Sequence, residues 1–361
     1  MRREGFVIPA IAGTIACAAL TLGASDSVDP ASRAVALSDA QLAGTRVITG
    51  FTGRRPPPEL RRMISAGEVS GVILFDRNVA GRRSVRRLTD ELQAIPRPAG
   101  ANQPLLVTVD QEGGLVRRLP GPPKPSAEAI GSRGAGFAKR IGRAAGKSLR
   151  GMGVNVDLAP VLDLGRRGRA IEEEGRTFAR KPGAVAAIGG AFARGLAAGG
   201  VAATAKHFPG LGAARVNTDN AVQRIRLSEA TLRRADERPF AGFVGAGGAL
   251  VMLSTAIYPA LSGAPASLSR EIATGELRER LGFAGVSITD ALGTVSARAF
   301  GGPARTAAAA AAAGTDLVLF TDLGSAAKAQ RALEAGLRDG SLPREEFEAA
   351  ASRVLALRAG L

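Results

Sequence analysis

Eight short runs rich in β-branched and aliphatic residues recur along the chain, and segments with helical signals separate them. These runs are residues 45–51, 71–75, 105–110, 154–162, 201–207, 249–254, 285–290 and 316–320. Apolar strands that alternate with helices are typical of a parallel sheet covered on both faces. Eight such units without a break in composition predict a single α/β domain, a closed (β/α)8 TIM-type barrel rather than an open Rossmann sheet.

Capping residues and glycines predict where the intervening helices begin and end. Ser84 is expected to cap an Arg-rich helix that runs through Leu92, and Ser228 and Ser269 are each expected to begin another helix. The longer helical segments are 135–152, 183–198, 270–281, 307–313 and a terminal helix, 344–357, on the outside of the barrel.

The amino terminus has the order of regions found in secretory signal peptides. Arg2 and Arg3 precede the uncharged apolar residues 6–22, and small residues follow, with a cleavage site after Ala24. We therefore predict a signal peptide over 1–24, a polar leader over 25–43, the barrel over 44–361, and export to the medium or the cell envelope. Two alternatives stay open: a poor lipobox that ends at Cys17, and an uncleaved anchor that is short for a bilayer span.

Composition excludes several kinds of site. The single cysteine, Cys17, excludes a disulfide framework and a cysteine-ligated metal site. The single histidine, His207, excludes a His-cluster zinc site. The net charge of +16 is compatible with nucleic acid, with an anionic surface or with an Arg-rich composition alone. The chain has no zinc finger, RNA-recognition motif or basic-aromatic stripe, so we predict no nucleic-acid partner, and membrane contact only through a lipidated or anchored amino terminus.

Polar residues follow the predicted strands at the end where barrels carry their chemistry. They are Asp76-Arg77-Asn78, residues 110–114, Asp163 with the later Arg176, residues 206–210, and Asp290. An aspartate at the end of a strand often caps the next helix, but five polar clusters at one end of a barrel indicate a site. The set contains no phosphate-binding loop and no dinucleotide fingerprint. Carboxylates beside Lys and Arg suit a sugar site and glycoside hydrolysis, in which two groups flank the scissile bond.

Three segments resemble one enzyme family. Residues 109–118, Val-Asp-Gln-Glu-Gly-Gly-Leu-Val-Arg-Arg, resemble the segment after strand 3 in the single-domain β-N-acetylhexosaminidase branch of glycoside hydrolase family 3. Lys-His-Phe-Pro-Gly at 206–210 and Gly-Val-Ser-Ile-Thr-Asp-Ala-Leu at 285–292 are similar to two further segments of that family. The order and spacing fit over residues 44–361.

The resemblance implies a role for each matching position. Asp290 would be the nucleophile of a retaining mechanism, in which a covalent glycosyl-enzyme forms and water later hydrolyses it. The positions that would bind the sugar are Asp110, Arg118, Arg176, Lys206 and His207. The other interpretations are a helix cap for Asp290 and a structural histidine for His207. No metal or organic cofactor is needed, because two side chains can perform the reaction.

The loop after the fifth strand departs from the family pattern. The acetylhexosaminidase branch carries an Asp-Ser-His triplet there, whose His is the acid/base, whereas this chain has Asn217 and Asp219 at the outer two positions. Asp219 could protonate the leaving oxygen if burial or a like charge raised its pKa. Otherwise a carboxylate such as Glu173 reaches the site, or activity is reduced or absent. A second departure is Thr255, where many relatives carry His, so part of the pocket wall is expected to differ.

We therefore predict an exported retaining glycoside hydrolase whose partner is a carbohydrate. It would remove terminal β-linked N-acetylglucosamine from cell-wall glycan fragments. A β-glucosidase-like specificity is one alternative, and a non-catalytic barrel that binds wall glycan is another. The sugar, the aglycone, the acceptor in the second step and the oligomeric state stay open.

Overall fold

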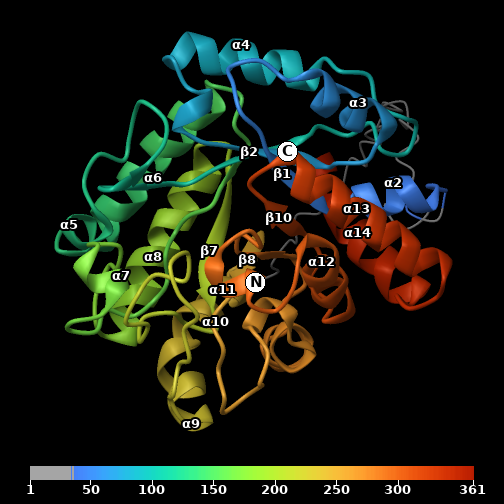
Figure 1. Cartoon of the computed structure of the whole chain (residues 1–361). Coiled ribbons are helices and arrows are strands. Elements are labelled where there is room, and N and C mark those ends of the chain that lie inside the picture. Colours follow the sequence, from blue (N-terminus) through green and yellow to red (C-terminus); the bar gives the residue numbers. More distant parts are fainter. Residues whose placement is uncertain (1–33, 35) are drawn as a thin grey trace, which may run out of the picture.

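The computed structural model describes residues 34 and 36–361, so the predicted signal peptide lies outside the described residues. Eight parallel strands form the barrel in the order β10-β1-β2-β3-β6-β7-β8-β9 (Figure 1). The prediction of a (β/α)8 barrel is confirmed. The strands are β1 Val47–Gly50, β2 Gly71–Leu74, β3 Leu106–Val109, β6 Val156–Asp157, β7 Ala202–Phe208, β8 Leu250–Leu253, β9 Val286–Thr289 and β10 Val318–Phe320.

Helices surround these strands on all sides of the barrel (Figure 1). They are α2 Asp39–Gly44, α3 Pro58–Ala66, α4 Arg82–Gln93, α5 Ala127–Gly131, α6 Gly134–Arg150, α7 Ala170–Glu173, α8 Pro182–Ala198, α9 Glu229–Thr231, α10 Arg238–Gly245, α11 Val295–Arg298, α12 Pro303–Ala312, α13 Leu323–Arg338 and α14 Arg344–Ala359. No helix among the described residues is long and apolar enough to cross a membrane.

Side chains of the strands pack in two layers because successive residues point to opposite faces of a strand. Ile48, Ile73, Leu106 and Ile288 belong to the cluster inside the barrel, which Val354 of α14 also joins. Their neighbours in the strands, such as Val47, Val72 and Val107, belong to the second cluster, between the barrel and the helices. Burial on both faces explains why the strands could be recognised as nearly continuous apolar runs.

Several helices differ from their predicted bounds. Helix α4 begins at Arg82 after Gly81, and Ser84 lies within its first turn, where its hydroxyl donates to the Gly81 carbonyl. Ser228 caps α9 as predicted, but a π-helical turn over Leu232–Asp236 follows, and the segment after Ser269 is a π-helix over Glu271–Arg280. Helix α2, with a capping box at Ser38, begins in the segment predicted as a leader and ends at Gly44, the first residue predicted for the barrel.

The barrel closes between β9 and β10, and a buried carboxylate holds that seam. The two strands share one bridge, Ile288 with Leu317. Below it, Asp316 Oδ2 accepts hydrogen bonds from the backbone N–H of Ser287 at 2.7 Å and from its hydroxyl at 3.0 Å. Arg353 of α14 donates to Asp316 Oδ1 at 2.8 and 3.0 Å, and Arg278 of the π-helix pairs with Oδ2. One carboxylate therefore ties two strands and two outer helices together.

We predict that Asp316→Asn lowers the free energy of unfolding by about 3 kcal/mol. Asp316 is fully buried, and its loss leaves two arginines without their counter-ion, which is the costly way to break a buried ion pair. Urea unfolding followed by circular dichroism measures the change.

Glu346→Gln is the matched control, because Glu346 pairs with Arg270 at the surface, where both side chains are about half exposed. We expect that change to cost less than about 1 kcal/mol. Equal effects from the two substitutions would contradict the role given to Asp316.

Candidate active site

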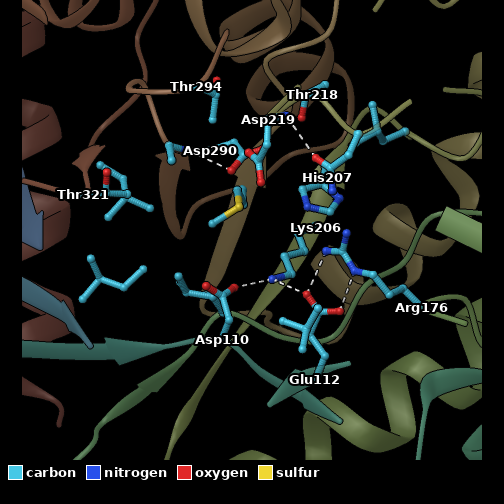
Figure 2. A pocket seen from close by; sticks show the side chains of 18 of the residues that line it. Asp110, Glu112, Arg176, Lys206, His207, Thr218, Asp219, Asp290, Thr294 and Thr321 are labelled. Atoms are coloured by element: carbon cyan, nitrogen blue, oxygen red, sulfur yellow. Dashed lines mark hydrogen bonds and ion pairs between the residues drawn. The ribbon is translucent and has the colours of Figure 1, made fainter. Parts of the chain in front are cut away.

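A cavity of about 580 Å³ opens at the carboxyl ends of the strands (Figure 2). Residues from the segments that follow β2, β3, β6, β7, β9 and β10 line it, as expected for a barrel of this kind. The seven side chains predicted from the sequence all line this one cavity: Asp110, Arg118, Arg176, Lys206, His207, Asp219 and Asp290. Phe75, Met252 and Leu319 add apolar surface to its wall.

A small hairpin after β3 brings Glu112, a carboxylate to which the sequence analysis gave no role, into the cavity. Strand β4 (Gln111–Gly113) pairs antiparallel with β5 (Val116–Arg117). The Gln111 side chain bonds both the N–H and the carbonyl of Leu119, which fixes the base of the hairpin. Gly113 adopts a φ of 102°, and a Cβ there would lie 2.2 Å from the Pro125 carbonyl oxygen. The glycine pair after Glu112 is therefore required by the turn.

Four charged side chains, Asp110, Glu112, Arg176 and Lys206, form what we call the ion network (Figure 2). Arg176 donates to both oxygens of Glu112 at 2.9 Å. The Lys206 ammonium lies 2.5 Å from Asp110 Oδ1 and 2.7 Å from Glu112 Oε1. Glu112, Arg176 and Lys206 are all buried, so Glu112 is the shared counter-ion of two cations.

The charges of the network set its protonation states. Burial alone would raise the pKa of Glu112, but Arg176 and Lys206 outweigh it and hold that pKa well below its usual range. Burial would likewise lower the pKa of Lys206, but Asp110 and Glu112 raise it instead. These shifts favour the charged forms of Glu112 and Lys206, and the network presents fixed donors and acceptors to a polyhydroxylated ligand.

A third carboxyl lies beneath the network in a different state. Asp157 is fully buried, and its Oδ1 accepts a hydrogen bond from the Gln111 N–H at 3.0 Å. Burial raises the pKa of Asp157 well above its usual value, and the nearby charges of Asp110 and Glu112 add to that rise. Asp157 therefore favours its neutral form and supports the backbone that carries Asp110 and Glu112.

His207 is held from behind by Asp163. The imidazole Nδ1 lies 2.7 Å from Asp163 Oδ2, while Asp163 Oδ1 accepts from the Leu211 N–H at 2.6 Å. Both residues are buried. His207 can therefore have both roles expected from the sequence. One ring nitrogen is bound within the protein, as in a structural histidine, and the ring still lines the cavity.

Asp219 and Asp290 lie together on the opposite side of the cavity from the ion network (Figure 2). The loop that carries Asp219 docks on α11, since the N–H groups of Val295 and Ser296 donate to the carbonyls of Asp219 and Thr218 at 3.3 Å. The Asn217 side chain accepts from the Asp219 N–H at 3.0 Å. Asp219 is exposed at the mouth of the cavity, but its carboxyl is partly buried. This burial is the larger cause of the raised pKa of Asp219, and the negative charge of Asp290 is the second.

Asp290 does not cap the helix that follows it. Its Oδ1 accepts from the N–H of the next residue, Ala291, at 2.7 Å. The cap of α11 is Thr294, whose hydroxyl accepts from the Ala297 N–H at 3.3 Å. The carboxylate of Asp290 is therefore available to the cavity.

Three further expectations concern Arg118, Glu173 and Thr255. Arg118 lies at the mouth, where its guanidinium is 3.8 Å from Asp76. Glu173 is exposed and does not line the cavity, whereas its neighbour Glu174 does and bonds Arg176 at 3.0 Å. Thr255 is buried outside the cavity lining, and its carbonyl accepts from the Ser296 hydroxyl at 2.8 Å. The Thr255 side chain therefore adds nothing to the cavity wall, and the expected difference from relatives that carry His there stays a prediction.

Sequence reasoning placed Glu112 and Asp163 in polar clusters of the site but gave them no role, and it missed Glu174. Charge balance could have identified Glu112, because two cations buried at the mouth of a barrel require more than one carboxylate. A buried histidine likewise calls for a partner on one ring nitrogen, which points to Asp163. Among the described residues, no group of three His, Cys, Asp or Glu side chains could hold a metal ion.

Comparison with known proteins places this arrangement in a family. The model of the glycosyl hydrolase family 3 N-terminal domain matches residues 37–357. An uncharacterised secreted glycosyl hydrolase of Arthroderma benhamiae is 39% identical over 92% of this chain and 96% of its own length. A β-hexosaminidase of Stenotrophomonas maltophilia is 35% identical over 76% of this chain and 82% of its own.

Solved structures agree with this placement. The β-N-acetylhexosaminidase of Beutenbergia cavernae superposes with a TM-score of 0.83 at 34% identity, over 89% of this chain and 98% of that one. The family 3 β-N-acetylglucosaminidase of a Paenibacillus species gives a TM-score of 0.84 at 34% identity, over 90% of this chain but 63% of that one. The chain therefore belongs to glycoside hydrolase family 3 and consists, in its described part, of the barrel domain of that family.

Proposed function

We propose that this glycoside hydrolase removes a terminal β-linked N-acetylglucosamine with retention of configuration, with Asp290 as nucleophile and Asp219 as acid/base. The observation that carries the proposal is the pair of carboxyls, Asp219 and Asp290, facing the ion network across one cavity. Burial and the charge of Asp290 raise the pKa of Asp219, which favours the protonated form that an acid needs.

In the first step an oxygen of Asp290 bonds the anomeric carbon while the bond from that carbon to the leaving oxygen breaks. The proton of Asp219 passes to the leaving oxygen, so the aglycone departs as a neutral alcohol. In the second step Asp219, now a carboxylate, takes a proton from water as the water oxygen attacks the anomeric carbon. The ester bond to Asp290 breaks, and both carboxyls return to their initial states.

The ion network and His207 would hold the sugar during both steps. Charged donors and acceptors bind vicinal hydroxyls strongly in a buried site, because an unpaired partner there is costly. The N-acetylglucosamine specificity is supported by the names of the relatives, which include β-hexosaminidases and β-N-acetylglucosaminidases. A secreted relative and the apolar amino terminus support export, and cell-wall glycan fragments are the substrate that we propose for an exported enzyme.

Asp290→Asn is expected to reduce hydrolysis of a chromogenic β-N-acetylglucosaminide by at least about 10³-fold, because the amide cannot form the covalent intermediate. The assay compares this sugar with the matching β-glucoside, which tests the alternative specificity, and circular dichroism verifies the fold of the variant.

Absence of turnover by the unmodified chain, combined with glycan binding that Asp290→Asn leaves unchanged, would contradict the enzymatic proposal. A non-catalytic barrel that binds wall glycan would behave in this way. The replacement of the family's usual His by Asp219 favours that alternative.

Asp219→Ala is expected to lower kcat/KM about 10²- to 10⁴-fold for an alkyl glycoside and far less for a dinitrophenyl glycoside, which needs no protonation on leaving. Because the acid must be protonated and the pKa of Asp219 is raised, activity of the unmodified chain should fall as pH rises through that pKa. The pH profile of kcat/KM in the variant should lack this alkaline limb. An alkaline limb that persists in Asp219→Ala would exclude Asp219 as the acid.

Glu112→Gln is expected to lower kcat/KM about 10- to 100-fold, since hydrogen bonds to charged groups are worth about 1.5–3 kcal/mol and Glu112 orients both Lys206 and Arg176. Glu173→Gln removes the same charge from an exposed position outside the cavity lining and serves as the control, with an expected loss below about threefold. Inhibition by N-acetylglucosamine measures the sugar affinity separately. Equal losses from both variants would show that net charge, not the position of Glu112, matters.

A further inference from the structure

Six exposed cations lie on three neighbouring outer helices of the barrel, α4, α6 and α8, and we call them the basic face (Figure 1). They are Arg82, Lys139, Arg140, Arg143, Lys147 and Arg194. None of them lines the cavity of the site. The ion pairs within the described part of the chain are all formed by other cations, so these six charges have no carboxylate partner there.

Close packing joins the three helices into one surface. Gly142 of α6 and Gly195 of α8 face each other's helix, and a Cβ on either glycine would lie 2.4 Å from a backbone oxygen of the other helix. On its other side α6 contacts α4, because Arg82 donates to the Ser148 hydroxyl at 2.7 Å. The exposed cations of the three helices therefore share one side of the barrel.

The charge of this surface is not offset by acidic residues of its two longest helices. Helix α6 contains five Lys or Arg residues and no Asp or Glu, and α8 contains one Arg and no Asp or Glu. An Arg-rich composition alone does not explain this difference, because α14, of nearly the same length, has three arginines and three glutamates. The positive charge is therefore concentrated on the α6 side of the barrel.

Three of the cations form a line along α6. Lys139, Arg143 and Lys147 are four residues apart, so each lies about 6 Å from the next along the helix axis. Like charges at this spacing repel each other and destabilise a helix. A linear polymer with an anionic group on each repeat would remove the repulsion by pairing with successive cations. The spacing thus favours a linear polyanion over a single small anion.

We infer that the basic face binds an acidic polysaccharide, a linear glycan that carries a carboxylate on its repeating unit. Such binding would hold the enzyme on a glycan matrix while the cavity at the end of the barrel stays open. The surface and its charge are independent of the proposed function. Only the choice of a glycan as the polyanion rests on the proposed export and substrate.

Two other anionic partners fit the surface less well. Helices that lie on a bilayer insert apolar side chains, but the large apolar side chains exposed in the described residues, such as Leu115 and Val295, lie outside α4, α6 and α8. Proteins that bind single-stranded nucleic acid stack bases on aromatic rings. The aromatic side chain of α6, Phe137, is half-buried, and the Arg133 guanidinium lies 4.2 Å from its ring centre.

Polygalacturonate tests the inference, because it carries one carboxylate on each sugar and no N-acetylglucosamine for the active site. Fluorescence anisotropy of an end-labelled oligomer measures its binding to the unmodified chain. We expect the affinity to fall as salt rises from about 50 to about 500 mM, since ions screen exposed charges. The fully methyl-esterified polymer keeps the backbone without the charge and should not bind.

A triple variant localises the binding, with Lys139→Gln, Arg143→Gln and Lys147→Gln combined. We expect its affinity for polygalacturonate to be about 10- to 100-fold lower, because one exposed charge pair is worth roughly two- to fivefold. Hydrolysis of a chromogenic glycoside should be unchanged, since none of the three residues lines the cavity.

The matched control removes the same charge from another side of the barrel. It combines Arg305→Gln of α12 with Lys328→Gln and Arg331→Gln of α13, all three of which are exposed. We expect this variant to bind polygalacturonate within about twofold of the unmodified chain.

The outcomes separate this inference from the proposed function, because binding is measured without turnover. Equal losses of affinity in the two triple variants would show that net charge alone drives binding and would overturn the basic face. Binding of the methyl ester as tight as that of the acid would overturn it as well. Tighter binding of an oligodeoxythymidylate of equal charge, or of phosphatidylglycerol vesicles, would overturn the choice of partner. Each of these results leaves the glycosidase proposal standing.

Discussion

Glu112 is the group on which the site depends, because it makes burial of two cations at the mouth of the barrel possible. A buried lysine or arginine without a counter-ion is strongly destabilising, and the two cations here come from different parts of the chain. Lys206 lies near the carboxyl end of β7 and Arg176 lies in the segment after α7, while Glu112 reaches both from the β4–β5 hairpin. The one carboxylate thus fixes three segments relative to one another and determines where a ligand finds donors and acceptors.

The strands could be predicted from the sequence because they are buried on both faces. Runs such as residues 71–75 and 249–254 are nearly continuous apolar segments, and each contains a strand of the barrel. The β4–β5 hairpin escaped prediction for the opposite reason. It is short, polar and built on Gln111, Glu112 and two glycines, so it has no apolar alternation to reveal it. Helix starts were harder to predict. For α4 the sequence pointed to Ser84 as the cap, whereas the helix begins at Arg82 and its cap position is Gly81.

Site residues were predictable where they follow a strand and resemble a family segment, and less so where they act through another residue. Asp163 directly follows the predicted strand over residues 154–162, but only its contact with His207 shows that it orients that ring. Glu174 and Glu173 are neighbours in sequence, and which of them reaches Arg176 depends on the turn that ends α7. Such choices depend on side-chain direction in loops, which residue type and spacing do not determine.

The replacement of a histidine by Asp219 is consistent with the proposed two-step reaction, because the two carboxyls affect each other. Burial and the charge of Asp290 together raise the pKa of Asp219, which favours the protonated form that the proposed first step needs. As Asp290 bonds the sugar it loses its charge, so Asp219 becomes a stronger acid when the leaving oxygen needs a proton. When water attacks, Asp290 regains its charge, and Asp219 becomes a stronger base as it accepts the proton of water. A carboxyl beside the proposed nucleophile thus changes its acidity in the direction that each step requires. A histidine at this position would also respond to the loss and return of the Asp290 charge, but its pKa would start from a higher value.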